Sequence, residues 1–373
     1  MLKVQEYLRS GKTFDDLTSE LAIKVCYHNS LPLAILNYDQ IESSKTHPIV
    51  RECRGLVLRT DTLEVAARSF PRFFNWGEVQ EEMPLFDFNN CFVQEKVDGS
   101  LCIIYFFEGE WHANTRGSFA VDKMEHQDFT WREAFCKAMN APDLKYFGSG
   151  NTGPLNPKLT YICEFCSPYN KIVRRYEKPM MYLLTAFEGE RELSLTECGN
   201  LIAELGVFDR PNEYLFKSIE EIQDHLTKMS ETDPTYEGVV IRDIHNHRWK
   251  IKSPTYLGLH RLKGEGDNLF NPKHLIPFVM TGEADELLTY FPEVKEKFLE
   301  LQAKLHAEYI KLLELWIDSH DIMSQKDFAL SIQGKSPYTS VLFNARKKEG
   351  PDAKAATLKK EWREAEGQIA KRL

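Results

Sequence analysis

Lys96 lies in the heptapeptide Gln94-Glu95-Lys96-Val97-Asp98-Gly99-Ser100. The chain is apolar and partly β-branched on both sides of it, at Val93 and along residues 101–107, which predicts two strands that meet at the lysine. Asp98-Gly99 is a turn pair, so we expect Lys96 at a strand end beside a binding pocket. A lysine becomes nucleophilic only when nearby cations or burial favour its free amine. Alone, the motif also fits an exposed lysine before a hairpin turn.

Further signals follow the lysine in a fixed order. They are Thr115-Arg116-Gly117-Ser118, Ile162-Cys163-Glu164-Phe165, Leu183-Leu184-Thr185-Ala186-Phe187, Glu237-Gly238-Val239-Val240-Ile241 and Trp249-Lys250-Ile251-Lys252. In the last segment, the period of two of a strand places Lys250 and Lys252 on one face. Each signal alone has an ordinary interpretation, such as a solvated lysine, an edge glutamate or a core phenylalanine. Their joint occurrence in this order makes those interpretations improbable.

This ordered set resembles the covalent nucleotidyltransferase superfamily of DNA ligases, RNA ligases and mRNA capping enzymes. Two upstream segments, Glu52–Val57 and Ser69–Asn75, are similar to the ATP-dependent RNA ligase 1 family of T-even-type bacteriophages. Glu164-Phe165-Cys166-Ser167-Pro168 and Asn170-Lys171-Ile172-Val173 are also similar to that family. The resemblance covers about residues 45–260 and is thin elsewhere.

The distribution of periodicity predicts an α+β fold. From Leu31 to Lys252 the chain shows short apolar runs between turn residues, with helical segments near 128–139 and 196–205 and a surface loop at 147–157. After Pro254 strand signals fade, and apolar residues then recur at spacings of three and four from Val294 to Trp316. We therefore expect an antiparallel-sheet, ATP-grasp-like nucleotidyltransferase domain at residues 1–260 and an all-helical C-terminal domain at residues 261–373. An OB-fold, typical of DNA ligases and capping enzymes, would show five short strands instead.

The resemblance implies a role for each basic residue of the site. Lys96 would attack the α-phosphorus of ATP and carry AMP. Lys250 and Lys252 would contact the α-phosphate, and their charge would lower the pKa of Lys96. Arg54 and Arg72 would hold the β- and γ-phosphates, because a guanidinium contacts phosphate oxygens bidentately. Arg116 would also bind the nucleotide, although close phage relatives more often have lysine there and at the position of Arg72.

The remaining implied contacts involve acidic and aromatic residues. Glu164 would bind the ribose hydroxyls. Phe187 would stack on adenine, with a plain core aromatic as the alternative. Glu237 would anchor Mg²⁺, or Mn²⁺ in its place, with Asp98 as a second candidate that otherwise shapes the lysine loop. Glu95 would contact the adenine edge.

The formal net charge of −9 requires basic residues to be concentrated locally if the partner is RNA. Lys171, Arg174 and Arg175 lie near the expected site. A C-terminal basic run is the second candidate, with a solvated helix face as the favoured alternative because glutamates interleave with it. Its members are Arg346, Lys347, Lys348, Lys354, Lys359, Lys360, Arg363, Lys371 and Arg372.

Composition predicts an intracellular protein without a membrane segment. No signal-peptide pattern and no apolar run of spanning length is present. The eight cysteines predict reduced core thiols, and Cys163 and Cys166 form a C-x-x-C without a second pair at zinc spacing. We expect a monomer in the cytoplasm, that of the host cell if a phage encodes it.

These predictions combine into one function. An ATP-dependent RNA ligase would join 5′-phosphate and 3′-hydroxyl RNA ends through lysyl-AMP and RNA-adenylate intermediates, with broken tRNA in an infected cell as a candidate substrate. The alternatives are a DNA ligase, an mRNA capping guanylyltransferase, or an inactive RNA-binding relative that inherited the fold.

Overall fold

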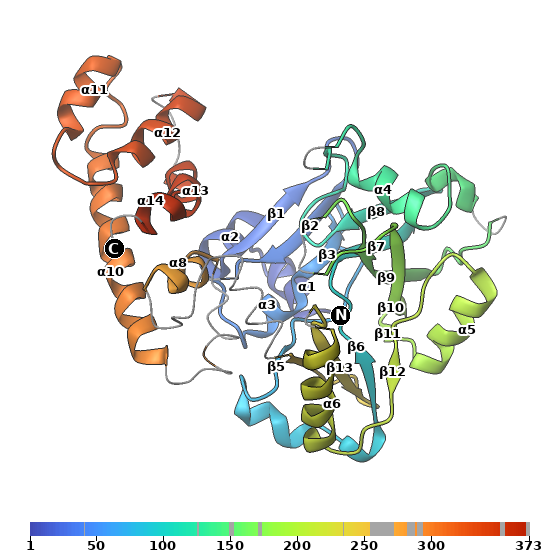
Figure 1. The fold of residues 1–373 in the computed structure, drawn as a ribbon. Coiled ribbons are helices and arrows are strands. Elements are labelled where there is room, and N and C mark those ends of the chain that lie inside the picture. The colour runs from blue at the N-terminus through green and yellow to red at the C-terminus, as the bar shows by residue number, and fades with distance from the viewer. Residues whose placement is uncertain are drawn as a thin grey trace. The chain divides into compact units, whose positions relative to one another are not determined.

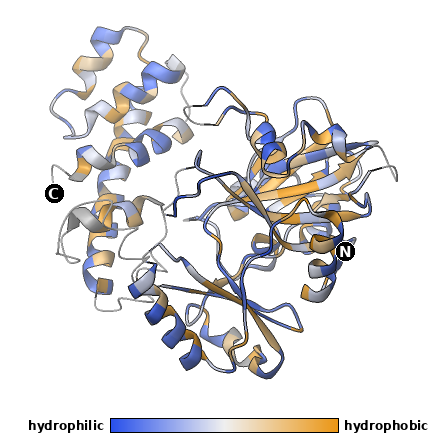
Figure 2. Cartoon of the chain, turned by 45° about the vertical axis from the view of Figure 1, so that its right-hand side comes forward, coloured by the Kyte–Doolittle hydropathy of each residue, from blue (hydrophilic) through white to orange (hydrophobic). Residues whose placement is uncertain are grey.

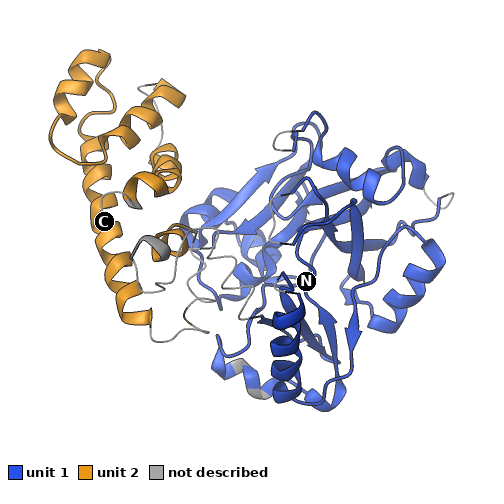
Figure 3. Cartoon of the chain, in the orientation of Figure 1, with its two compact units in different colours: residues 1–260 blue, residues 261–373 orange. Residues whose placement is uncertain are grey.

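A computed structural model describes residues 1–40, 42–124, 127–148, 153–170, 174–233, 235–253, 272–281, 288, 294–350 and 355–370. The chain divides into two compact units, unit 1 at residues 1–260 and unit 2 at residues 261–373 (Figure 3). Within the described residues, strands occur only in unit 1, and unit 2 is built from helices. This division matches the loss of strand signals after Pro254 in the sequence.

Unit 1 contains three sheets among its described residues (Figure 1). The first sheet has the order β1 (Ile23–Tyr27), β2 (Leu33–Tyr38), β3 (Arg54–Arg59) and β4 (Val65–Ala67). The second has the order β11 (Arg191–Glu192), β10 (Met180–Glu188), β9 (Leu159–Cys166), β7 (Ser100–Phe107) and β8 (Glu110–Thr115). The third has the order β12 (Glu213–Tyr214), β6 (Cys91–Glu95), β13 (Gly238–Asp243), β14 (Arg248–Lys252) and β5 (Phe74–Asn75). Neighbouring strands are antiparallel except β14 and β5, which are parallel.

The helices of unit 1 begin at residues that satisfy free backbone amides. These helices are α1 (Lys3–Arg9), α2 (Phe14–Leu21), α3 (Pro48–Glu52), α4 (Trp131–Ala138), α5 (Leu195–Leu205) and α6 (Ile219–Thr232), with 3₁₀ turns η1 (Gln80–Leu85), η2 (Phe88–Asn90) and η3 (Leu144–Phe147). Helix α4 begins with a capping box, in which Thr130 and Glu133 each accept a backbone N–H of the other. Helix α5 ends at Gly206, whose φ of 62° is left-handed.

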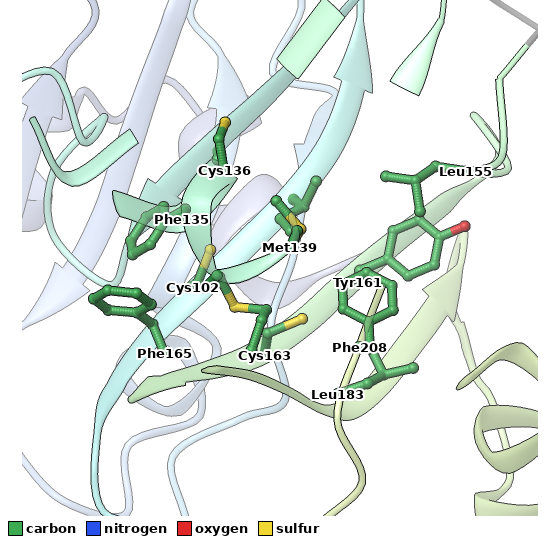
Figure 4. Close-up of a cluster of buried hydrophobic side chains, with 14 of the residues drawn as sticks. Cys102, Phe135, Cys136, Met139, Leu155, Tyr161, Cys163, Phe165, Leu183 and Phe208 are labelled. Carbon is green, nitrogen blue, oxygen red and sulfur yellow. The ribbon is translucent and has the colours of Figure 1, made fainter. Parts of the chain in front are cut away.

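The largest core of unit 1 lies against the second sheet. In it, Phe135 and Cys136 of α4 and Met139, which directly follows α4, pack with Cys102 of β7 and Cys163 of β9 (Figure 4). All eight cysteines are free thiols, as the sequence predicts. A separate core packs Ile222 and Leu226 of α6 against the third sheet. Because that core takes Trp249 and Ile251 of β14, the alternate side chains Lys250 and Lys252 lie on the opposite face of that strand.

Unit 2 is helical throughout its described residues. It contains α8 (Pro272–Thr281), α10 (Lys295–Ile317), α11 (Gln325–Ile332), α12 (Thr339–Glu349), α13 (Ala355–Glu364) and α14 (Glu366–Ala370). Hydrophobic and hydrophilic residues alternate along α10 (Figure 2), and its buried stripe is Phe298, Leu301, Leu305, Leu312 and Trp316. The predicted α+β fold, with antiparallel sheets followed by a helical C-terminal region, is confirmed.

The basic run of unit 2 does not form one exposed cationic surface. Arg346 is buried, and its guanidinium donates to Gln325 Oε1 and to the carbonyl oxygens of His320, Ile322 and Met323. Lys348 pairs with Glu361 and Glu364. Arg346 therefore fixes the connection between α10 and α11 and is not available to RNA, which corrects its inclusion in the candidate surface. Lys354, Lys371 and Arg372 lie outside the described residues.

Candidate active site

Lys96 directly follows β6 and is held by both its backbone and its side chain. Its backbone N–H donates to the carbonyl oxygen of Gly238 at 2.8 Å, which extends the pairing of β6 with β13 by one residue. The turn after it fits only a small residue, because a Cβ on Gly99 would lie 2.5 Å from the carbonyl oxygen of Phe165. The predicted strand–lysine–strand arrangement is therefore what the chain forms, with β7 beginning at Ser100.

Glu237 joins the lysines of two different segments. Its Oε2 lies 2.8 Å from Lys96 Nζ, and its Oε1 lies 3.2 Å from Lys252 Nζ. The Glu237 side chain is 5% exposed and that of Lys96 is 22% exposed, so the pair is shielded from most of the solvent. We name Lys96, Glu237, Lys252 and Glu164 the lysine group.

Gly238 allows β14 to approach Glu237 closely. Its φ is +141°, and a Cβ there would lie 2.1 Å from the carbonyl oxygen of Ile251. No side chain fits at that distance, so a glycine must follow Glu237 in this arrangement. The close approach of β14 therefore explains why glycine follows Glu237 in the motif identified in the sequence.

The charges of the lysine group shift two pKa values. Burial and Lys252 lower the pKa of Lys96, but Glu237 and Glu164 more than offset them, so its net pKa is raised. The predicted lowering of this pKa is therefore wrong for the protein without ligand, because the acidic neighbours outweigh the basic ones. Burial raises the pKa of Glu164 to about 7, against the opposing charges of Lys96 and Arg54.

A second cluster surrounds Tyr38 at the end of β2. The guanidinium carbon of Arg72 lies 4.3 Å from the centroid of the Tyr38 ring, and that of Arg116 lies 5.3 Å from it. Burial raises the pKa of Tyr38, but Arg116, Arg54, Arg72 and Lys250 together lower it below its usual value. We name Tyr38, Arg54, Arg72 and Arg116 the arginine group. Sequence analysis missed Tyr38, since nothing in the run Leu33–Tyr38 distinguishes it from a core strand.

The arginine group has unused capacity to bind an anion. Arg72 is buried, and its Nη1 has no hydrogen-bond partner within the described part of the chain. Arg54 donates from Nη1 to Ser69 Oγ at 3.3 Å and lies over the Phe70 ring at 4.5 Å, and the charges of Glu164 and Tyr38 also act on it. Unsatisfied buried donors on cationic groups fit a phosphate ligand. The structure thus places Arg54, Arg72 and Arg116 together, with the charge of Lys250 acting on the same tyrosine.

Asp98 and Glu95 fix the loop that carries Lys96. Asp98 is buried and accepts the backbone N–H of Arg174 at 3.0 Å. Glu95 accepts from the Arg174 guanidinium through Oε1 and from Asn212 Nδ2 through Oε2. Both Glu95 oxygens are occupied, which does not favour the expected adenine contact. Arg174 is likewise engaged by acidic groups, and Lys171 lies outside the described residues.

Phe187 lies in a hydrophobic cluster that also contains Phe70 and Ile103. Its ring is 3% exposed, and the guanidinium carbon of Arg68 lies 4.9 Å from the ring centroid. This environment matches the alternative of a core aromatic. Its partner in β9 is Thr160, four residues before Glu164.

The residues present fit a divalent cation at Glu237. No cluster of three or more histidine, cysteine, aspartate or glutamate side chains suited to a metal occurs among the described residues. Magnesium does not require one, because it is commonly held by one or two carboxylates together with substrate phosphates and water. Glu237, buried beside the basic residues expected to bind phosphates, has this character.

Comparison with known proteins identifies the family. A family model described as RNA ligase, of the T4 RNA ligase 1 type, matches residues 52–256, which is more than half of the chain. The chain belongs to the RNA ligase family. This membership confirms the family predicted from the sequence.

Two relatives of this RNA ligase family show how far the likeness extends. A protein of Autographa californica nuclear polyhedrosis virus named as a bifunctional polynucleotide kinase/RNA ligase is 32% identical over 306 residues, covering 79% of this chain and 42% of the viral protein. An RNA ligase of Rhodothermus phage RM378 is 26% identical, covering 69% of this chain and 71% of the phage protein. The chain therefore spans less than half the length of the first relative.

A solved archaeal ATP-dependent RNA ligase aligns with this chain over 92% of this chain and 83% of the archaeal chain, at 14% identity and a TM-score of 0.47.

Within the described residues, no helix has the length and apolar character needed to cross a bilayer.

Proposed function

We propose that this protein is an ATP-dependent RNA ligase that carries AMP on Lys96 and joins the 5′-phosphate and 3′-hydroxyl ends of RNA. The observation that supports this most is the contact of Glu237 with both Lys96 and Lys252. The three residues are far apart in the sequence and meet only in the fold. A nucleophilic lysine, a buried carboxylate and a second lysine in contact are the groups that phosphoryl transfer to a lysine needs.

In the first step, Lys96 Nζ attacks the α-phosphorus of ATP. The P–N bond forms, the bond to the pyrophosphate oxygen breaks, and the lysine proton must already have left. Because Glu237 raises the pKa of Lys96, the free protein holds this lysine charged. A divalent cation supplies positive charge at the phosphate oxygens. Glu237 would hold that cation, and the charge of Lys252 acts to disfavour the charged form of Lys96.

The arginine group orients the leaving pyrophosphate. Arg54, Arg72 and Arg116 contribute three guanidinium groups around Tyr38, and the free Nη1 of Arg72 provides a donor for a phosphate oxygen. Lys250 acts on the same tyrosine. Positioning and charge neutralisation supply most of the catalysis in phosphoryl transfer, so this cluster is suited to the triphosphate.

Glu164 binds the ribose, because a carboxylate accepts hydrogen bonds from hydroxyl groups. In the second step AMP passes from Lys96 to the 5′-phosphate of RNA, forming a 5′-5′ pyrophosphate. In the third step a 3′-hydroxyl attacks the activated phosphate and AMP leaves. Only the first step involves the β- and γ-phosphates of ATP.

Residues 1–260 form the adenylyltransferase domain of this proposal, including the family-specific N-terminal segment, and residues 261–373 form a helical domain that selects RNA. Asp98 shapes the lysine loop. The finer assignments are a broken tRNA substrate, a monomeric enzyme and, for a phage protein, the cytoplasm of the host. These assignments rest on the resemblance to the phage family. The tRNA assignment is tested by comparing the sealing of broken tRNA with that of unstructured RNA.

The decisive experiment is covalent labelling with ATP carrying a label on the α-phosphate, in the presence of magnesium. We expect label on the parent protein that survives denaturation, is absent from Lys96→Ala and is retained by Lys158→Ala, a control at an exposed lysine. Addition of 5′-phosphorylated RNA should release the label. Labelling by GTP would support the capping alternative. The absence of any label on folded protein that is not already adenylylated would contradict the proposal.

A further inference from the structure

The Phe70 ring lies beside the guanidinium groups of two arginines. The guanidinium carbon of Arg54 is 4.5 Å from the ring centroid, and that of Arg248 is 4.8 Å from it. Phe70 is 5% exposed, so both cation–π contacts are largely shielded from solvent. Such contacts are strongest where water is excluded.

Arg248 is fixed from the second sheet. Its guanidinium forms a two-point contact with Glu192 of β11, with Nη1 donating to Oε2 at 3.0 Å and Nη2 donating to Oε1. Both side chains are buried, with exposures of 7% and 5%. Burial alone would raise the pKa of Glu192, but Arg248 and Arg242 more than offset this and lower it, so the carboxylate is charged and compensates the arginines. This makes the position of Arg248 over Phe70 well defined.

The contacts of Arg54 contrast with those of Arg248. Arg248 donates two hydrogen bonds to a carboxylate, whereas the contacts of Arg54 are with the Ser69 hydroxyl and the rings of Phe70 and Phe73, and the charge of Glu164 acts on it. An aromatic face holds a guanidinium in place without neutralising it. This property suits an arginine that must be positioned and still remain free to bind an anion.

We propose that Phe70 is a positioning residue for Arg54 in the step that uses ATP. Arg248, which Glu192 holds in place, contacts the same ring. The inference rests on the proposed function. Arg248 also lies two and four residues before Lys250 and Lys252 on the same strand. The same contacts therefore link the arginine group with the lysine-bearing strand β14.

The test compares four variants in two assays. Phe70→Leu removes the aromatic face, Phe70→Tyr keeps it, and Arg248→Lys keeps the charge opposite Glu192 but loses the planar group. Phe107→Leu is the matched control, because Phe107 belongs to the same hydrophobic cluster, is 9% exposed and contacts Arg59, an arginine outside the site. One assay measures lysyl-AMP formation against ATP concentration. The other measures sealing of pre-adenylylated RNA, which needs no ATP.

We expect Phe70→Leu to lower kcat/KM for ATP by about three- to thirty-fold, the range of a shielded cation–π contact. Its sealing of pre-adenylylated RNA should stay within about twofold of the parent. Phe70→Tyr should have a kcat/KM for ATP close to that of the parent. Arg248→Lys should lower kcat/KM for ATP less than Phe70→Leu does. Phe107→Leu should retain both activities.

Two results would overturn the inference. One is an unchanged ATP dependence in Phe70→Leu. The other is an equal loss by Phe70→Leu and Phe107→Leu in both assays, which would mean a contribution to core packing only. If the parent protein formed no lysyl-AMP, the proposed function would itself fail. A labelled parent with an unaffected Phe70→Leu variant would reject the positioning role alone.

Discussion

Lys96 Nζ lies 2.8 Å from Glu237 Oε2, and the second oxygen of the same carboxylate lies 3.2 Å from Lys252 Nζ. One buried acid thus balances two bases in the protein without ligand. Glu237 and Glu164 together raise the pKa of Lys96, against burial and the charge of Lys252.

Lys96→Arg should abolish lysyl-AMP formation while keeping the fold. Arginine maintains a positive charge beside Glu237 but is not deprotonated near neutral pH, so it cannot attack phosphorus. Thermal melting should remain within a few degrees of the parent, since the ion pair is preserved. The variant should still seal pre-adenylylated RNA, and loss of that activity together with a collapsed melting temperature would contradict the expectation.

Glu237→Gln should slow lysyl-AMP formation by about two orders of magnitude at a fixed magnesium concentration. The amide keeps the size of the side chain and removes the charge that holds a cation. Raising the magnesium concentration should recover part of the rate, which a titration of rate against metal measures. A variant with the metal dependence of the parent would show that Glu237 does not hold the ion. Chelation of the metal should abolish labelling of the parent.

Glu164 should make stability depend on pH. Its pKa is raised from 4.5 to about 7 in the folded protein, so the folded state binds this proton more tightly than the unfolded chain does. Its contribution to stability is therefore present below pH 4.5 and is lost as the pH rises to about 7. Relative to Glu164→Gln, the parent should lose about 2–3 kcal/mol between these values. Urea unfolding of both proteins across this range tests it, and parallel profiles would count against it.

Arg346→Met should lower the free energy of unfolding of unit 2 by about 3 kcal/mol, because four acceptors lose a charged donor. Lys347→Met, at the exposed neighbouring position, should change it by less than about 0.5 kcal/mol. Denaturant unfolding followed by tryptophan fluorescence gives both values, since Trp316 and Trp362 belong to the core of unit 2. Equal effects of the two substitutions would refute the structural role of Arg346.

A chain truncated after residue 265 should retain lysyl-AMP formation and change its choice of RNA. The lysine and arginine groups lie entirely within unit 1, so we expect the first step to need no residue of unit 2. Labelling with ATP and sealing of tRNA and unstructured RNA measure the two properties. Loss of lysyl-AMP formation by the truncated chain would indicate a structural contribution of the C-terminal region instead.

The strands near Lys96 could be predicted because their apolar residues alternate or run continuously between turn pairs. The long helix α10 could be predicted because its buried residues repeat at helical spacing. Helix α6 was missed, since only Ile222 and Leu226 are buried on it and two residues make a weak stripe. Strand β1 was missed as well, because it precedes the first strongly apolar run.

The residues of the lysine and arginine groups were named from the order of motifs, with the exception of Tyr38. The direction of the Lys96 pKa shift was wrong, because it depends on which charges lie nearest in space. Glu237 outweighs Lys252 only through its distance from Lys96, which no spacing in the sequence reveals. The burial of Arg346 was hidden for the same reason, since its acceptors are carbonyl oxygens of a connecting segment.

Gly238 has a consequence for how such a chain diverges. A side chain at this position would collide with β14, so its loss disrupts the sheet, whereas Lys96 is 22% exposed and a second lysine, Lys252, still pairs with Glu237 when Lys96 is replaced. A lineage that abandons ligation should therefore lose the lysine long before the glycine. Descendants that keep Gly238 but have replaced Lys96 would be proteins that retain the fold and have lost the reaction.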